Sequence, residues 1–333
     1  MMDVEGWISW LRRKKAPTTI YVYTAYMRKY IDFCEARRLD PERVESVDEW
    51  VGHMQKKGLT PATINTQFYA VASYFTYIGR GQEVLRVVRP SVKQRRIEIY
   101  QLDEAWKLID LAGTNPHIKA ILTLLLINGL RLGEALTLHI DDILQPNWSR
   151  PPSEWEPYTI EGTPCIYVTR EKVREGIDFG LEPTQEEVIE AVRNTLRARE
   201  DLQGGAWREL KRSVNLPKED RPHRWYLFYS PHSPRGYYDP SGVRKHLGRL
   251  CRILGIPYRS PHKLRHTRAT HIIAETGDLA AAQQFLRHRS IATTMRYVHL
   301  APQLLIKKIP KVERPEASGS EEKDINSGEE KEE

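Results

Sequence analysis

Apolar residues recur every three or four positions through the first 80 residues, which is the period of an α-helix. A helix is predicted from the cap at Thr18 or Thr19, with an apolar face formed by Tyr23, Met27, Tyr30, Ile31 and Cys34. A further helix is predicted over residues 47–56. The pattern therefore indicates that residues 1–85 form a small, all-helical domain.

The clearest helix start in this domain is Leu59-Thr60-Pro61. Thr60 is the expected N-cap and Pro61 the first helical residue, where a missing N–H costs nothing. One side of this helix carries Ile64, Phe68, Val71, Ala72, Phe75 and Ile78. Gly79 and Gly81 are expected to end it.

From residue 99 onward the pattern changes to longer helices with a little β-structure. Residues 165–181 alternate and enclose a charged tip, which predicts a β-hairpin, and residues 225–229 resemble a brief strand. Helices are predicted over residues 101–112, 117–128, 184–199, 241–254, 261–275, 278–286 and 291–299, with another starting near Arg131. The expected fold is mainly α with a small β-hairpin or sheet, in two domains.

Charge is distributed unevenly along the 333 residues, whose formal net charge is +7. Residues 313–333 hold nine acidic and three basic residues, so this tail is expected to be disordered. The first 312 residues keep 48 of the 51 Lys and Arg but only 35 of the 44 Asp and Glu. Such a basic body suits a polyanion such as nucleic acid, although a generically soluble surface would look the same.

Residues 86–98 are predicted to be a basic linker that separates the first domain from a second domain over residues 99–312. An extended connector of this charge could follow a phosphate backbone, and a solvated hinge is the alternative. The predicted DNA-binding residues of this linker are Arg86, Arg89, Lys93, Arg95 and Arg96.

Several protein classes are disfavoured by the sequence. The longest apolar stretch, residues 120–130, is too short to cross a bilayer and contains Thr123 and Asn128, and no secretory signal is readable at the N-terminus. The three cysteines lie far apart without a CxxC pair, so neither a disulfide framework nor a zinc site is expected. We therefore expect a cytoplasmic protein without a metal or cofactor.

Two helix starts carry side chains suited to binding an anion. Ser260 and Pro261 are expected to begin a helix on which His262 and Arg265 share the face of the first turn, where free N–H groups already favour negative charge. Near the other start, Glu134 lies one turn after Arg131 and could orient its guanidinium. Solvated basic turns and surface ion pairs are the alternatives.

With these elements, the sequence resembles the tyrosine site-specific recombinases. The resemblance rests on Gly129-Leu130-Arg131-Leu132-Gly133-Glu134, then Pro261-His262-Lys263-Leu264-Arg265-His266-Thr267, then Leu286-Arg287-His288, and finally Tyr297. It covers roughly residues 1–310, is closest to two-domain Xer and integrase members, and implies that the two domains form a C-shaped clamp. Residues 57–65 are the most typical stretch of that family's core-binding domain.

The resemblance implies a role for each matching residue. Tyr297 would be the nucleophile, Arg131 and Arg265 would clamp the scissile phosphate, and His262 and His288 would complete the pocket. The family protonates the leaving oxygen with a hairpin lysine, which implies Lys172, with Arg170 and Arg174 as alternatives in a neighbouring register. Arg287 departs from the family, which often has a glycine at this position.

The implied function is site-specific DNA recombination through a 3′-phosphotyrosine, for integration or excision of a mobile element or for chromosome dimer resolution. The implied partners are double-stranded DNA with specific recombination sites and three further copies of the chain, forming a homotetramer on synapsed DNA. Free protein would be a monomer or weak dimer, located with the nucleoid. Residues 300–312 would dock on a neighbouring protomer or, alternatively, on their own. The other functions considered are DNA relaxation like that of type IB topoisomerases and a non-catalytic accessory role.

Overall fold

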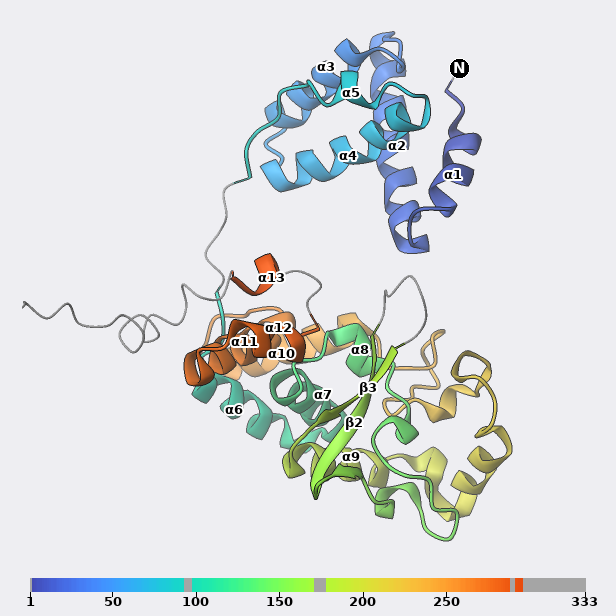
Figure 1. Cartoon of the computed structure of the whole chain (residues 1–333), viewed down its shortest axis with the longest axis vertical. Helices are drawn as coiled ribbons and strands as arrows, with labels where there is room; N and C mark the ends of the chain where they lie inside the picture. The colour runs from blue at the N-terminus through green and yellow to red at the C-terminus, as the bar shows by residue number, and fades with distance from the viewer. Residues whose placement is uncertain (1, 93–97, 171–177, 288–290, 296–333) are drawn as a thin grey trace, which may run out of the picture. The chain divides into compact units, whose positions relative to one another are not determined.

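The computed structural model describes residues 2–92, 98–170, 178–287 and 291–295 (Figure 1). The chain divides into two compact units, residues 1–96 and residues 97–333. The N-terminal unit is helical. Its helices are α1 (Val4–Arg12), α2 (Pro17–Arg37), α3 (Val44–Lys56), α4 (Pro61–Tyr77) and the short α5 (Gly81–Val84).

The helix starts in this unit test the sequence predictions directly. Thr60 caps α4 as expected, because its side chain accepts a hydrogen bond from the N–H of Thr63 at 3.3 Å, and Pro61 is the first helical residue. The predicted cap of α2 is wrong. The helix begins at Pro17 with Ala16 at the N-cap, so Thr18 and Thr19 lie inside its first turn. A proline at the first position fixes the helical φ before the threonines are reached.

The core of the N-terminal unit is built by the apolar faces of its four longer helices. Its largest fully buried side chains are Trp7, Tyr30, Phe68, Tyr74 and Phe75. The indole of Trp7 donates to Ser73 Oγ at 3.1 Å, so α1, which the sequence analysis did not predict, is held against α4. Packing of this kind, more than intrinsic propensity, stabilises a nine-residue helix.

Part of the predicted linker packs against this unit. Val87 is buried, and the carbonyl of Pro90 accepts a hydrogen bond from Asn65 Nδ2 at 3.0 Å. The guanidinium of Arg89 lies 4.2 Å from the ring centroid of Phe68. Residues 86–92 therefore follow the surface of α4, while residues 93–97 lie outside the described part of the chain.

The C-terminal unit is larger and combines helices with a small sheet. Its α-helices are α6 (Leu102–Leu111), α7 (Pro116–Ile127), α8 (Leu132–Leu136), α9 (Glu186–Arg197), α10 (Pro240–Ile253), α11 (His262–Thr276), α12 (Leu279–Phe285) and α13 (Ile291–Met295). Its strands are β1 (Tyr158–Ile160), β2 (Thr163–Arg170) and β3 (Asp178–Pro183), and its 3-10 segments are η1 (Ala112–Thr114), η2 (Ile140–Asp142), η3 (Pro152–Glu154), η4 (Glu200–Ser213), η5 (Lys218–Asp220) and η6 (His223–Trp225).

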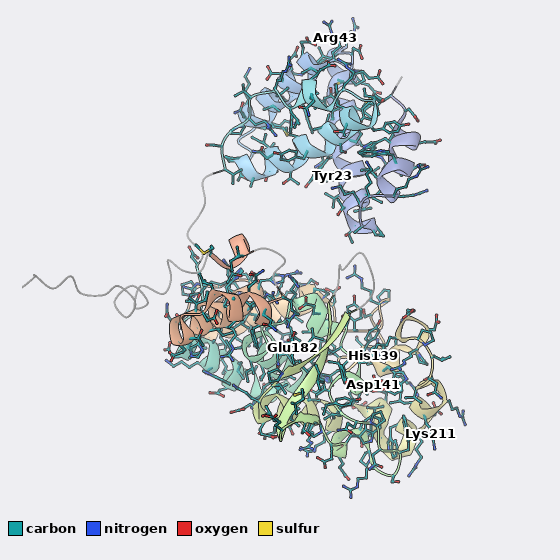
Figure 2. The ribbon with its side chains drawn as sticks, in the orientation of Figure 1. Tyr23, Arg43, His139, Asp141, Glu182 and Lys211 are labelled. Atoms are coloured by element: carbon teal, nitrogen blue, oxygen red, sulfur yellow. The ribbon has the colours of Figure 1, made fainter. Side chains whose placement is uncertain are left out.

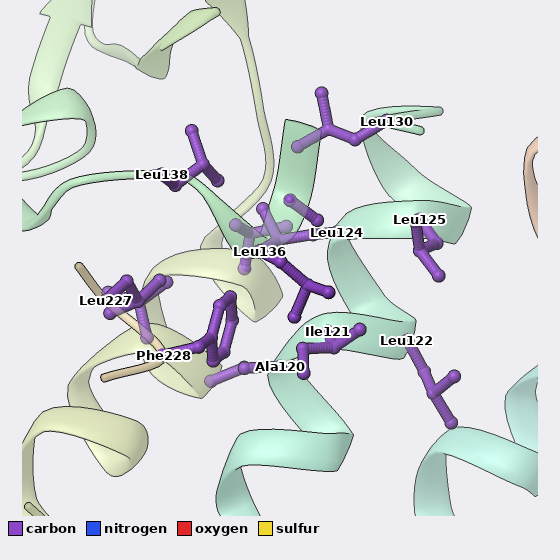
Figure 3. Packing of buried hydrophobic residues seen from close by; sticks show 14 of the residues in the cluster. Ala120, Ile121, Leu122, Leu124, Leu125, Leu130, Leu136, Leu138, Leu227 and Phe228 are labelled. Atoms are coloured by element: carbon purple, nitrogen blue, oxygen red, sulfur yellow. The ribbon is translucent and has the colours of Figure 1, made fainter. Parts of the chain in front are cut away.

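Helix α7 forms the centre of this unit, as its apolar sequence predicts. It packs against α6, α8, α9 and α11, and its residues from Ala120 to Leu126 are all buried (Figure 3). Side chains from distant loops, including Leu227 and Phe228, complete the cluster around it. Because α7 is covered on several sides, it forms a rigid support for α8 and α11, which both carry predicted site residues.

The predicted hairpin is confirmed and belongs to a sheet. Among the described residues the strands form an antiparallel sheet in the order β1-β2-β3, with Cys165 opposite Pro183 and Arg170 opposite Asp178. The tip of the hairpin, residues 171–177, lies outside the described residues. Strand β1, which the sequence analysis did not predict, pairs with β2 through a tight turn at Glu161 and Gly162, both with positive φ.

The strand predicted over residues 225–229 is wrong. Trp225 ends η6, and Tyr226 and Tyr229 make isolated bridges to His139 and Tyr237. Trp225, Leu227 and Phe228 are nonetheless fully buried. The apolar pattern therefore reflects an irregular segment whose side chains enter the core one by one, without a continuous partner strand.

Two further features bear on the protein classes considered above. Within the described residues no helix is both long and apolar enough to span a bilayer. Cys34, Cys165 and Cys251 all lie in the described part of the chain as buried free thiols.

Candidate active site

The first turn of α11 carries the centre of the candidate site. His262 is the first residue of this helix, and Arg265 lies one turn further on, buried in the protein. The predicted Ser260 cap is wrong, because Pro261 occupies the N-cap position and the carbonyl of Ser260 accepts from the N–H of Lys263 at 2.8 Å. Since α11 packs on α7, the position of Arg265 is fixed by the core.

Two backbone carbonyls hold the guanidinium of Arg265. Its Nη1 donates to the carbonyl of Gly129 and its Nη2 to the carbonyl of Leu286. These carbonyls come from the end of α7 and the end of α12, far apart in sequence. A planar guanidinium with donors in a fixed fork is suited to bridging such separate acceptors.

Gly129 has a conformation that the site requires. Its φ of +57° lies in the left-handed region, and a Cβ built on it would come within 3.1 Å of Leu286 and 3.2 Å of Phe285. A side chain here would be strained by the backbone and would crowd α12. Glycine thus allows the turn between α7 and α8 to bring its carbonyl up to Arg265.

Arg131 and Glu134 form the ion pair that the sequence predicted. Glu134 accepts from the backbone N–H of Arg131 at 2.7 Å and from its Nη1, which ties the arginine side chain to the start of α8. Glu134 is nearly buried, whereas Arg131 remains about half exposed. Glu134 therefore orients the guanidinium of Arg131, which remains accessible to solvent.

The same carboxylate lies between three arginines. Glu134 Oε2 is 3.9 Å from Arg265 Nη1 and 3.5 Å from Arg287 Nη2. Burial would raise the pKa of Glu134, but Arg287, the backbone N–H and Arg131 together hold it below its usual value. The carboxylate stays ionised, so its stabilising contribution is present above its ordinary pKa and is lost as the pH falls through the lowered value.

His262 faces the positive side of this cluster. His262 is exposed, yet desolvation by the neighbouring residues lowers its pKa, and the positive charges of Arg265, Arg244 and Arg131 lower it further, while Glu134 acts in the opposite sense. The imidazole is therefore neutral at pH 7, with one ring nitrogen able to accept a proton. Because protonation is disfavoured in the folded state, the contribution of His262 to stability declines as the pH falls below the ordinary histidine pKa.

The electrostatic origin of this shift can be tested. Arg244→Gln should raise the pKa of His262, because it removes a positive charge that opposes protonation. Arg249→Gln, an exposed change on the same helix, should leave that pKa close to its value in the unchanged protein. Titration of the histidine Cε1–H signals by NMR measures both. Equal pKa values for His262 in the two variants would contradict this account.

A second pair of charged residues, Arg287 and Glu182, was not identified as part of the site from sequence. Arg287 Nη1 donates to Glu182 Oε2, and both side chains are nearly buried. Glu182 belongs to β3 and is labelled in Figure 2. The sequence signal for this pair was the arginine at a position where the resembling family often has glycine.

The structure brings Arg131, Glu134, His262 and Arg265 together in one charged cluster at the start of α11. Lys172, His288 and Tyr297 lie outside the described residues, as do Lys93, Arg95 and Arg96. Of the remaining predicted DNA-binding residues, Arg86 is exposed and Arg89 stacks on Phe68 and Tyr69. In the described part of the chain, no three His, Cys, Asp or Glu side chains are grouped so that they could hold a metal ion.

The chemistry of this charged cluster follows from the side chains that form it. Two guanidiniums and a neutral imidazole surround the start of a 15-residue helix, whose dipole adds positive potential. Such an arrangement can bind a tetrahedral oxyanion and stabilise charge that develops on it, with a proton acceptor beside it. A phosphodiester group is an anion of this kind.

Comparisons with known proteins show which chains and folds this protein is similar to. Residues 162–303 match the phage integrase family. The chain is 27% identical to tyrosine recombinase XerC of Pelotomaculum thermopropionicum over 281 residues, covering 81% of this chain and 80% of the relative. It is 25% identical to tyrosine recombinase XerA of Thermococcus kodakarensis, covering 92% and 90%. Its fold is similar to XerH site-specific recombinase crystallised with the palindromic difH substrate, with a TM-score of 0.61, 18% identity and coverage of 86% and 78%.

Proposed function

We propose that this chain is a tyrosine recombinase, which cuts and rejoins DNA strands at specific sites through a covalent 3′-phosphotyrosine. The family match and the Xer relatives support site-specific recombination as the reaction. The observation that carries the residue assignment is the convergence of Arg131, Arg265 and His262 on the start of α11, with Glu134 beneath them.

In this reaction a phenolic oxygen of Tyr297 attacks the scissile phosphorus. Negative charge develops on the non-bridging oxygens, and Arg131 and Arg265 neutralise it. His262, neutral at pH 7, accepts the phenol proton and returns it when the strand is rejoined. His288 donates a further hydrogen bond to the phosphate.

The leaving 5′-oxygen takes a proton from Lys172, which lies between β2 and β3 in the sequence. The phosphotyrosine keeps the energy of the broken phosphodiester bond, so the freed 5′-hydroxyl of a partner strand can displace Tyr297 without an external energy source. The reaction therefore conserves the number of phosphodiester bonds and forms a Holliday junction between two sites.

The partner is double-stranded DNA. Solved structures of similar folds include XerH and a lambda integrase bound to DNA sites. We propose that four copies assemble on two synapsed sites, that residues 300–312 dock on the neighbouring copy, and that free protein is a monomer or weak dimer. The N-terminal unit, residues 86–96 and the basic body contact the phosphate backbone, which places the protein on the nucleoid in the cytoplasm.

A two-site exchange assay tests this function. The recombination site is first found by sequencing the DNA ends that are covalently attached to the protein. Two labelled duplexes that both contain this site should then yield a joint molecule with exchanged flanks. The matched control is a duplex with the cleaved sequence scrambled, which should give no joint molecule. Relaxation of supercoiled plasmid regardless of sequence would instead indicate a topoisomerase-like activity, and DNA binding without any covalent adduct would indicate an accessory protein.

A further inference from the structure

We propose that Arg287 is a positioning residue that ties strand β3 to the phosphate pocket. Its guanidinium bridges Glu182 of β3 and Glu134 of α8, so the end of the hairpin, the start of α8 and the end of α12 are held as one unit. This inference rests on the proposed function, because the pocket it organises is the one assigned to the scissile phosphate. Arg287 acts through its neighbours and is not itself assigned a contact with DNA.

The contact with Glu182 makes the two residues mutually dependent. Glu182 has a side chain that is only 11% exposed, and Arg287 is 4% exposed. A buried carboxylate is costly when its cationic partner is removed, because the charge loses its compensation while water stays excluded. Arg287 therefore allows an acidic residue to lie at the edge of a pocket that must attract a phosphate.

The other side of the guanidinium shares its acceptors with Arg265. Arg287 Nη2 lies 3.4 Å from the carbonyl of Gly129 and 3.5 Å from Glu134 Oε2, and Arg265 Nη1 contacts the same two oxygens. Two like charges can lie this close because two carboxylates, Glu134 and Glu182, neutralise them. Loss of Arg287 would change the surroundings of Arg265 directly.

Strand β3 also contacts the end of α7 through hydrogen bonds. The bridge made by Arg287 therefore adds to an existing connection between this strand and the core. Asn128 Nδ2 donates to the carbonyl of Pro183 at 3.3 Å, and Asn128 Oδ1 accepts from Thr184 Oγ1 at 2.9 Å. The end of β3 is thus fixed to the end of α7, and Arg287 adds a link from the preceding residue, Glu182, to α12. Together these contacts set the position from which the hairpin leaves the core.

The backbone of Arg287 provides an independent argument that its side chain matters. Its φ of +53° lies in the left-handed region, where glycine is at ease and a residue with a Cβ is strained. If this position served only to turn the chain, glycine would adopt the conformation with less strain. An arginine here, with its guanidinium in ion pairs to two acidic residues, indicates that the side chain offsets the strain.

The test compares Arg287→Gly, Glu182→Gln and the double variant in single-turnover cleavage of a nicked suicide duplex. Arg287→Gly relieves the backbone but removes the cation that contacts Glu182 and Glu134, so the cleavage rate at saturating DNA should fall about 10- to 100-fold. The Kd for DNA should change little, because most phosphate contacts lie outside the pocket. Adding Glu182→Gln to Arg287→Gly should restore the rate to within about 3-fold of Glu182→Gln alone.

The opposite results would overturn the inference. A glycine variant that cleaves as fast as the unchanged protein would show that the position only turns the chain, and a loss that Glu182→Gln does not recover would show that Glu182 is not the coupled partner. If Arg287→Gly does not fold, Arg287→Lys replaces it. Lysine keeps the charge but cannot bridge both carboxylates as a fork, so a rate equal to that of the unchanged protein would contradict the bridge.

A second measurement separates this inference from the proposed function. Inorganic phosphate should raise the thermal midpoint of the unchanged protein and of the double variant more than that of Arg287→Gly. If no covalent adduct forms but this pattern is present, the recombinase assignment fails and the positioning role stands. If adducts form and neither rate nor phosphate response depends on Arg287, only the positioning role fails.

Discussion

Tyr297→Phe should abolish covalent attachment of the protein to DNA while leaving DNA binding intact. The change removes one oxygen atom, and that oxygen is the proposed attacking group. Without it, the phenyl ring at position 297 cannot form the phosphotyrosine. We expect the adduct yield on a nicked suicide duplex to fall by at least about 1,000-fold. The adduct is measured by its slower migration in a denaturing gel and by recovery of a phosphotyrosyl peptide after nuclease digestion.

The matched control is Tyr258→Phe, which makes the same chemical change at a half-exposed tyrosine of the C-terminal unit. It should form adducts at the normal rate, and both variants should bind DNA with unchanged affinity. Covalent attachment that persists in Tyr297→Phe would place the nucleophile elsewhere. It would also remove the role given to His262 as acceptor of the Tyr297 proton.

Arg265→Lys should reduce cleavage by about 100- to 1,000-fold, the range observed when one donor to a developing oxyanion is removed. The substitution keeps the positive charge but loses the planar fork that contacts the carbonyls of Gly129 and Leu286. Without these contacts, the ammonium of the introduced lysine is no longer held beside the phosphate. Single-turnover cleavage at saturating DNA measures the effect on the chemical step, separately from binding.

Arg265→Ala should have an additional effect on stability. It removes a buried charge from beside Glu134 and leaves two buried carbonyls without this donor, so we expect the free energy of unfolding to fall by about 3–5 kcal/mol. Urea denaturation followed by tryptophan fluorescence measures this loss. The control is Arg252→Lys on the exposed face of α10, which should leave both cleavage and stability unchanged. Full cleavage by Arg265→Lys would contradict the assigned clamp.

The helical parts of the fold were predictable because local signals agree with tertiary packing. The Thr60-Pro61 start and the apolar sequence of α7 each specify a helix and its buried surface, and both are confirmed. The strand predicted at residues 225–229 is wrong because an apolar run indicates that side chains are buried but does not indicate whether the backbone pairs with another strand. The cap predicted at Thr18 or Thr19 is wrong because the helix already begins at Pro17, and the cap at Ser260 is wrong because Pro261 itself occupies the N-cap position.

The sequence by itself determined the types and spacing of the candidate reactive residues, and with them the resemblance to the tyrosine recombinases. Arg131 with Glu134, and His262 with Arg265, are local pairs on one helical turn, so their relation follows from helix geometry. Only the tertiary structure decided that Glu134 lies between Arg131, Arg265 and Arg287, and that Glu182 of a distant strand faces Arg287. Contacts between residues more than 100 positions apart depend on how α7, α11 and β3 pack, and no local pattern records that packing.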